Sequence, residues 1–119
     1  MEKNPYFQFI RKYKKSEIIF EEGSIGSEMF IVYSGKVKIC KQNAGREEIF
    51  DMVGPGQFFG EMALVDNSPR SASAVSAADG TKVIPLNHDK FLYLISNQPV
   101  FALTIMSELC RRIRVLHSN

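Results

Sequence analysis

The sequence from residue 56 to residue 72 reads GQFFGEMALVDNSPRSA. Its second glycine, Gly60, permits a positive φ or a close approach of the backbone to a ligand. Residues 61–64 are fair helix formers, and the first N–H groups of such a turn lack partners within the helix and can bind an anion. Arg70 then supplies a planar fork of donors that fits two phosphate oxygens at once.

The same stretch supplies polar groups suited to a sugar. Glu61 has a carboxylate that accepts hydrogen bonds from vicinal hydroxyls, and Ser71 adds a hydroxyl beside the arginine. Each residue also has an ordinary explanation: Glu61 favours the positive end of a short helix, Gly60 marks a bulge, and Arg70 is a surface charge or half of an ion pair. Taken together, the residues predict a site for a ribose phosphate.

On either side of this stretch, residues 16–86 form short runs rich in Ile, Val, Phe and Tyr, separated by glycines. Many short strands at intervals of about ten residues indicate a sandwich, barrel or roll. Residues 36–41 alternate polar and apolar side chains, as a half-buried antiparallel strand does. The predicted strands are 17–20, 28–34, 36–42, 46–53, 57–59, 72–77 and 81–86.

Helices are predicted at both ends of the chain. The spacing of Phe7, Ile10 and Tyr13 predicts a short amphipathic helix within residues 1–15. Asn87 can cap a helix over residues 88–95.

A last helix is predicted from about Pro99, a residue tolerated in the first helical turn, to about residue 116. Its apolar residues recur at steps of four and three, as in a coiled coil, so the pattern leaves both core packing and a homodimer through this helix open. These residues are Ala102, Met106, Leu109, Ile113 and Leu116.

Length and composition favour one soluble intracellular domain over residues 1–119. The chain has 119 residues, 45% of them hydrophobic, and its net charge of +2 does not favour a nucleic-acid partner. Cys40 and Cys110 have no metal-binding spacing, and no signal peptide or membrane span is evident. We therefore expect a cytoplasmic protein with no membrane contact.

An enzyme is the least favoured interpretation. A metalloenzyme of the jelly-roll type needs two or three histidines converging from strands, whereas His88 and His117 both lie outside the predicted strands. No motif for a nucleophilic serine or cysteine is present. We expect no catalytic residue, no metal and no cofactor.

Residues 59–64 (FGEMAL) and 69–72 (PRSA) resemble the phosphate-binding cassette of the cyclic-nucleotide-binding domain family, and EEGSIGSEMFIVYSGKVKI (residues 21–39) resembles its early strands. The resemblance implies a mainly β fold: a jelly-roll-like β-roll, or double-stranded β-helix, with flanking helices. In the expected domain, residues 16–86 form the roll, residues 59–72 the cassette and residues 87–119 the C-terminal helices.

The resemblance also implies a site. Arg70 would pair with the cyclic phosphate and Glu61 would accept a hydrogen bond from the ribose 2′-OH. The small residue after the arginine, Ser71, favours cyclic AMP as ligand and leaves cyclic GMP open. Apolar flanks would come from Ile39, Phe50 and Val53, which can also be plain core residues. The implied ligand-binding set is Gly60, Glu61, Met62, Ala63, Arg70, Ser71 and Ala72.

Two departures qualify the implied function. In the family's bacterial receptor, a threonine and a serine of the last helix reach the adenine, but Leu116 and His117 occupy those positions here. That receptor also carries a helix-turn-helix module beyond this helix, whereas the sequence ends at Asn119. We therefore expect a ligand sensor that signals to a partner or output domain, either standing alone or as the sensor half of a transcription regulator.

Overall fold

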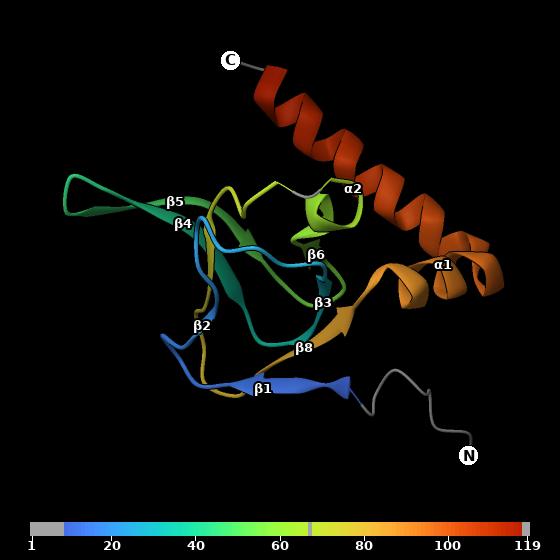
Figure 1. Cartoon of the computed structure of the whole chain (residues 1–119), viewed down its shortest axis with the longest axis horizontal. Helices are drawn as coiled ribbons and strands as arrows, with labels where there is room; N and C mark the ends of the chain where they lie inside the picture. The colour runs from blue at the N-terminus through green and yellow to red at the C-terminus, as the bar shows by residue number, and fades with distance from the viewer. Residues whose placement is uncertain (1–8, 67, 118–119) are drawn as a thin grey trace. The chain divides into compact units, whose positions relative to one another are not determined.

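The computed structural model describes residues 9–66 and 68–117, and the chain forms two compact units. The first unit ends at Asn87 and contains the strands, and the second begins at His88 and contains two helices (Figure 1). Each unit is described by itself below.

The strands of the first unit form two four-stranded sheets, ordered β1-β8-β3-β6 and β2-β7-β4-β5. Every pair of neighbours is antiparallel. The strands are β1 (Arg11–Tyr13), β2 (Ile18–Phe20), β3 (Met29–Ser34), β4 (Val37–Asn43), β5 (Arg46–Val53), β6 (Phe58–Phe59), β7 (Ser73–Ser76) and β8 (Thr81–Leu86).

Both sheets contribute to one hydrophobic core. Because side chains alternate between the faces of a strand, each strand can send every second residue into the space between the sheets. Four partly buried residues pack against this core: Tyr13, Ile19, Phe20 and Ile39. The buried cluster consists of Phe30, Val32, Phe59 and Val83 from the first sheet and Val37, Val53 and Ala74 from the second.

The mainly antiparallel β-roll with helices is confirmed. Each of the seven predicted strands is present, and its boundaries differ from the prediction by one residue at most. The strand assignments succeed because the apolar runs are short and glycines stand at their ends. At one of these turns, between β3 and β4, Gly35 has a φ of 87°.

The helix predicted within residues 1–15 is wrong where the structure describes this segment. Arg11–Tyr13 form strand β1, paired with Val83, Lys82 and Thr81 at the edge of the first sheet. The spacing of Ile10 and Tyr13 fits a helix, but pairing with β8 and packing of Tyr13 against the core override that local preference. Residues 1–8 lie outside the described residues.

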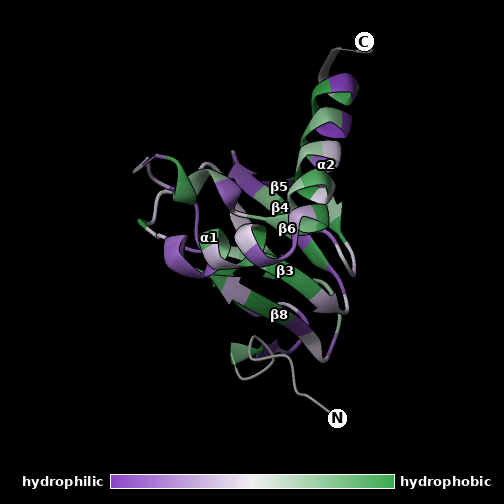
Figure 2. Cartoon of the chain, turned by 90° about the vertical axis from the view of Figure 1, so that its right-hand side faces the viewer, coloured by the Kyte–Doolittle hydropathy of each residue, from purple (hydrophilic) through white to green (hydrophobic). Residues whose placement is uncertain are grey.

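The second unit consists of α1 (His88–Asn97) and α2 (Pro99–His117), which confirms the two predicted C-terminal helices. Gln98 separates them: its N–H donates to the carbonyl oxygen of Leu94 (2.8 Å) and its own carbonyl accepts from the N–H of Phe101 (2.9 Å). The rings of Phe91 and Phe101 meet edge to face at 6.3 Å. Hydrophilic and hydrophobic residues alternate along α2 (Figure 2).

Candidate functional site

The cassette (residues 59–72) begins with a sharp change of backbone direction. After β6, Gly60 adopts the left-handed conformation, with φ 76° and ψ 16°, and a single turn of 3-10 helix, η2, follows over Glu61–Leu64. The turn predicted over residues 61–64 is therefore present. Within it, the N–H of Ala63 donates to the carbonyl oxygen of Gly60 at 3.3 Å.

The backbone of Arg70 is fixed to the loop that follows β2. Its N–H donates to the carbonyl oxygen of Ser24, and its own carbonyl accepts from the N–H of Gly23, both at 2.8 Å. These two hydrogen bonds fix the backbone of Arg70, from which its side chain extends. The position of the arginine therefore depends on a segment far from it in sequence.

The side chain of Arg70 is buried, with 9% of the residue exposed. Its Nη1 donates to the carbonyl oxygen of Gly60 at 3.1 Å, and its Nη2 donates to the carbonyl oxygen of Glu28 at 2.8 Å. The Cζ atom lies 4.1 Å from the ring centroid of Phe20. Among the described residues, the buried Nε of Arg70 has no hydrogen-bond partner.

Burial and a nearby carboxylate have opposite effects on the pKa of Arg70. Burial lowers the pKa of the Arg70 guanidinium from its ordinary value, and the nearby Glu28 carboxylate opposes this shift. That carboxylate is itself engaged by Arg11, whose Nη1 and Nη2 each lie 3.2 Å from one of its oxygens. No carboxylate in the described part of the chain forms an ion pair with Arg70. A buried cation without a paired anion is costly, so the site is electrostatically suited to bind one.

The comparison with known protein families bears directly on this site. The family model described as cyclic nucleotide-binding domain matches residues 10–98, which include the whole cassette. The chain belongs to this family.

Relatives of this cyclic nucleotide-binding domain include receptors and kinase subunits. The cyclic AMP receptor protein of Thermus thermophilus is 39% identical over 110 residues, which are 92% of this chain and 50% of the relative. The cAMP-dependent protein kinase regulatory subunit of Mycosarcoma maydis is 34% identical over 91 residues, 72% of this chain and 17% of the relative. The chain thus spans half or less of these two relatives.

A solved structure supports the same fold. The catabolite activator protein of Thermus thermophilus superposes with a TM-score of 0.77 at 34% identity, and the match covers 94% of this chain and 54% of that protein. The expected family and β-roll fold are therefore both confirmed.

Within the cyclic nucleotide-binding domain, the predicted site residues lie as follows. Arg70 contacts Gly60, so the two ends of the cassette meet. Glu61 occupies the first position of η2 and is half-buried. Met62 and Ser71 are exposed. Ala63 is half-buried and Ala72 is buried.

The three predicted apolar flanks differ in their environment. Val53 belongs to the core cluster, and the partly buried Ile39 packs against that cluster. Phe50 is 57% exposed and lies in a β-bulge, because Cys40 pairs with Ile49 while Ile39 pairs with Asp51. A bulge redirects a side chain, so Phe50 is the flank whose orientation the strand pattern did not predict.

The sequence did not indicate two residues that touch the arginine. Phe20 was expected only as part of a strand, and Gly26 only as one of several glycines. A Cβ added to Gly26 would lie 2.5 Å from Nη2 and 2.9 Å from Nε of Arg70. The sequence carried no signal for this role of Gly26: the residue has no positive φ, and its close approach to Arg70 arises only in the folded chain.

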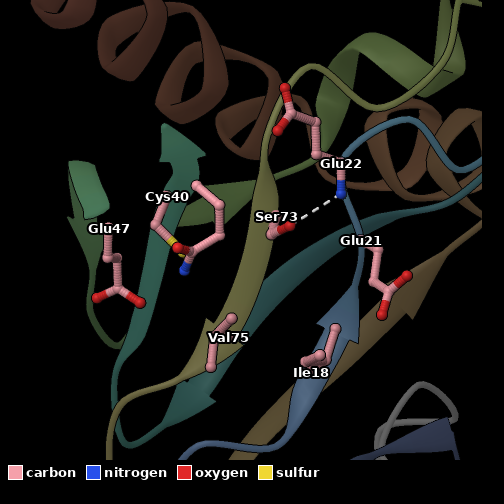
Figure 3. Close-up of a pocket in the computed structure, with 8 residues that line it drawn as sticks. Ile18, Glu21, Glu22, Cys40, Glu47, Ser73 and Val75 are labelled. Atoms are coloured by element: carbon pink, nitrogen blue, oxygen red, sulfur yellow. Dashed lines mark hydrogen bonds between the residues drawn. The ribbon is translucent and has the colours of Figure 1, made fainter. Parts of the chain in front are cut away.

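A separate pocket of about 300 Å³ lies on the second sheet, outside the cassette (Figure 3). Ser73 and Val75 flank the core residue Ala74 along β7, so they face away from the core. Two carboxylates that line the pocket lie near lysines: Glu47 is 2.8 Å from Lys38 Nζ, and Glu22 is 3.8 Å from Lys41 Nζ. The lining residues are Ile18, Glu21, Glu22, Cys40, Gln42, Glu47, Ser73 and Val75.

Other features of the sequence are located as follows. His88 is exposed and lies 4.0 Å from Asp89. The side chains of Leu116 and His117 lie outside the described residues. Among the side chains that the structure describes, no three of His, Cys, Asp or Glu are grouped as metal ligands would be. Within residues 9–66 and 68–117, no helix has the length and hydropathy of a membrane span.

Proposed function

We propose that the chain is a sensor that binds cyclic AMP between Arg70 and Glu61. The observation that carries this proposal is the buried guanidinium of Arg70, whose Nε–H has no partner among the described residues. An anionic oxygen would satisfy that donor and offset the cost of the buried charge. A cyclic phosphate supplies one negative charge and two free oxygens.

The preference for cyclic AMP over cyclic GMP rests on Ser71 and on the names of the two relatives, which specify cyclic AMP. The remaining proposed ligand contacts are the backbone at Gly60, Met62 and Ala63, the hydroxyl of Ser71, and Ala72. We propose that no cofactor takes part and that the ligand leaves the site chemically unchanged.

The proposal is tested by titrating the purified chain with cyclic AMP, cyclic GMP and 5′-AMP in a calorimeter. We expect saturable binding of cyclic AMP, weaker binding of cyclic GMP and the weakest binding of 5′-AMP, whose open phosphate carries a second charge and an extra oxygen. Recovery of unaltered cyclic AMP after long incubation would support sensing rather than catalysis. Absence of saturable binding for both cyclic nucleotides would overturn the proposal.

We further propose that ligand binding at the cassette changes the position of α1 and α2 and so signals to a partner or output domain. A ligand shifts such an equilibrium only by its difference in affinity for the two states. The sensor half of a transcription regulator is the second candidate, because a relative from Mycobacterium tuberculosis named as a cAMP-activated global transcriptional regulator is matched over 48% of its length. Hydrogen exchange of α1 and α2 with and without cyclic AMP tests the signal.

A homodimer through α2 is the proposed assembly. On α2, four exposed residues recur at steps of three and four, the spacing of a coiled-coil seam. They are Leu103, Met106, Cys110 and Ile113. Met106 and Ile113 also belong to the seam predicted from sequence. Sedimentation velocity of the chain and of Met106→Glu tests it: a dimer that becomes a monomer supports this seam, and a wild-type monomer at high concentration contradicts it.

A further inference from the structure

The rings of Phe20 and Phe30 both make cation–π contacts with the guanidinium of Arg70, and Phe20 is the closer of the two. The Cζ atom of Arg70 is 4.1 Å from the ring centroid of Phe20 and 5.9 Å from that of Phe30. The Phe20 ring is itself held by two neighbours, since its centroid lies 5.9 Å from the ring centroids of both Phe30 and Phe59. A ring fixed in this way gives the guanidinium a defined surface.

Two glycines enclose the rest of the guanidinium. A Cβ on Gly26 would lie 2.5 Å from Nη2, and a Cβ on Gly60 would lie 2.9 Å from Nη1. Real Cβ atoms are essentially never found at such distances, so a side chain at either position would displace the guanidinium or the backbone. With the carbonyl oxygens of Gly60 and Glu28, these residues form a slot that fits one orientation of the arginine.

We propose that Phe20 is a positioning residue, which holds the guanidinium of Arg70 in its slot before a ligand arrives. The inference rests on the proposed function, because it assigns to Phe20 the preorganisation of that same site. A cation stacked on a desolvated ring is stabilised by the ring's electrons. Without the ring, the arginine would sample other rotamers in the free protein, and ligand binding would have to order it.

The expected size of the effect follows from that ordering. Immobilising a long side chain costs about 0.5–1.5 kcal/mol, which corresponds to a loss of affinity of about two- to twelvefold. Phe20→Leu, which keeps an apolar side chain and removes the ring, should therefore weaken cyclic AMP binding by this factor. Phe20→Tyr keeps the ring and should bind as the wild type does.

A control separates positioning from general stability. Val37→Ala creates a cavity in the core cluster without changing any group that touches Arg70. It should lower the melting temperature and leave the affinity for cyclic AMP unchanged. If Phe20→Leu binds as tightly as the wild type, or if Val37→Ala loses as much affinity as Phe20→Leu, the inference is wrong. Should Phe20→Leu fail to fold, Phe20→Met replaces it under the same criteria.

A second measurement needs no nucleotide and so separates this inference from the proposed function. In the wild type, the ring current of Phe20 should shift the NMR signal of the Arg70 Nε–H, and the Nη protons should show slow rotation. Phe20→Leu should move the Nε–H signal toward its usual position and average the Nη signals, whereas Phe20→Tyr should not. Unchanged signals in Phe20→Leu contradict the inference, even if the wild type binds cyclic AMP. A wild type that shows these signals but binds no cyclic nucleotide contradicts the proposed function alone.

Discussion

A hydrogen bond between Arg70 and Gly60 joins the two ends of the cassette: Nη1 of the arginine donates to the carbonyl oxygen of the glycine at 3.1 Å. Gly60 is also the residue from which η2 starts, so the contact holds the cation beside the turn that begins with Glu61. This hydrogen bond therefore links the residue proposed to bind the phosphate to the turn that carries the residue proposed to bind the ribose.

The carboxylate of Glu61 should recognise the ribose rather than the phosphate. Glu61→Ala should lower the affinity for cyclic AMP by about ten- to a hundredfold, as expected for losing a hydrogen bond to a charged group. The affinity for 2′-deoxy cyclic AMP should change little, because that ligand lacks the hydroxyl. Calorimetry with both ligands checks this, and equal losses for both would assign Glu61 a structural role.

The residue after the arginine should influence the choice of base. Ser71→Thr adds a β-branched side chain, whose hydroxyl is restricted to fewer rotamers and can accept from the 2-amino group of guanine. The ratio of cyclic GMP to cyclic AMP affinity should therefore rise. Competition of the two nucleotides for wild type and variant measures this ratio; a ratio that stays constant or falls means that position 71 does not read the base.

Gly35 should contribute strongly to the stability of the first unit. It has a φ of 87°, and a Cβ there would lie 2.5 Å from Oγ1 and 2.7 Å from Cα of Thr81. Gly35→Ala should lower the free energy of unfolding by about 2–5 kcal/mol through backbone strain and overpacking. Gly45, with φ 79° and no atom within 4 Å of an added Cβ, is the matched control. Gly45→Ala should cost about 1 kcal/mol, and urea unfolding showing equal costs would contradict the steric account.

The stability of α2 should depend on pH through Glu108. Hydrogen bonds from Arg111, and the charges of Arg111 and Arg112, lower the pKa of its carboxyl against the opposing effect of burial. A carboxyl with a lowered folded-state pKa contributes stability above its unfolded pKa, and this contribution is lost as the pH falls through the folded value. Glu108→Gln should therefore unfold more easily than wild type by about 1 kcal/mol at pH 7.

The difference between Glu108→Gln and wild type should disappear in acid. Below the folded-state pKa both side chains are neutral, so their urea midpoints should converge. A difference that is independent of pH between neutral and acidic solution would show that the ion pairs do not stabilise the helix.

Most strands could be predicted because their signal is local. Short runs of β-branched and aromatic residues end at glycines, and one such glycine, Gly35, adopts a positive φ at a turn. Strand β1 escaped prediction because Arg11–Tyr13 is short and polar, and its conformation depends on pairing with β8. Edge strands of this kind carry little hydrophobic pattern of their own.

The site residues also differ in whether their sequence signal is local. Gly60, Glu61 and Arg70 form a compact motif that can be recognised along the chain. Phe20 and Gly26 belong to the site only because folding brings β2 and the following loop against Arg70. No local pattern marks a phenylalanine as the partner of a distant arginine, so such contacts can be found only from the structure.

The central claim is that the buried guanidinium of Arg70 holds the phosphate of a cyclic nucleotide. Its most direct test is the calorimetric affinity of cyclic AMP for wild type and Arg70→Ala, with circular dichroism melts to establish that both are folded. Arg70→Ala removes both the charge-assisted hydrogen bond that Nε–H would donate and the positive charge that faces the phosphate, so the account predicts a loss of about a hundredfold in affinity. A folded Arg70→Ala that binds cyclic AMP as tightly as the wild type would contradict it.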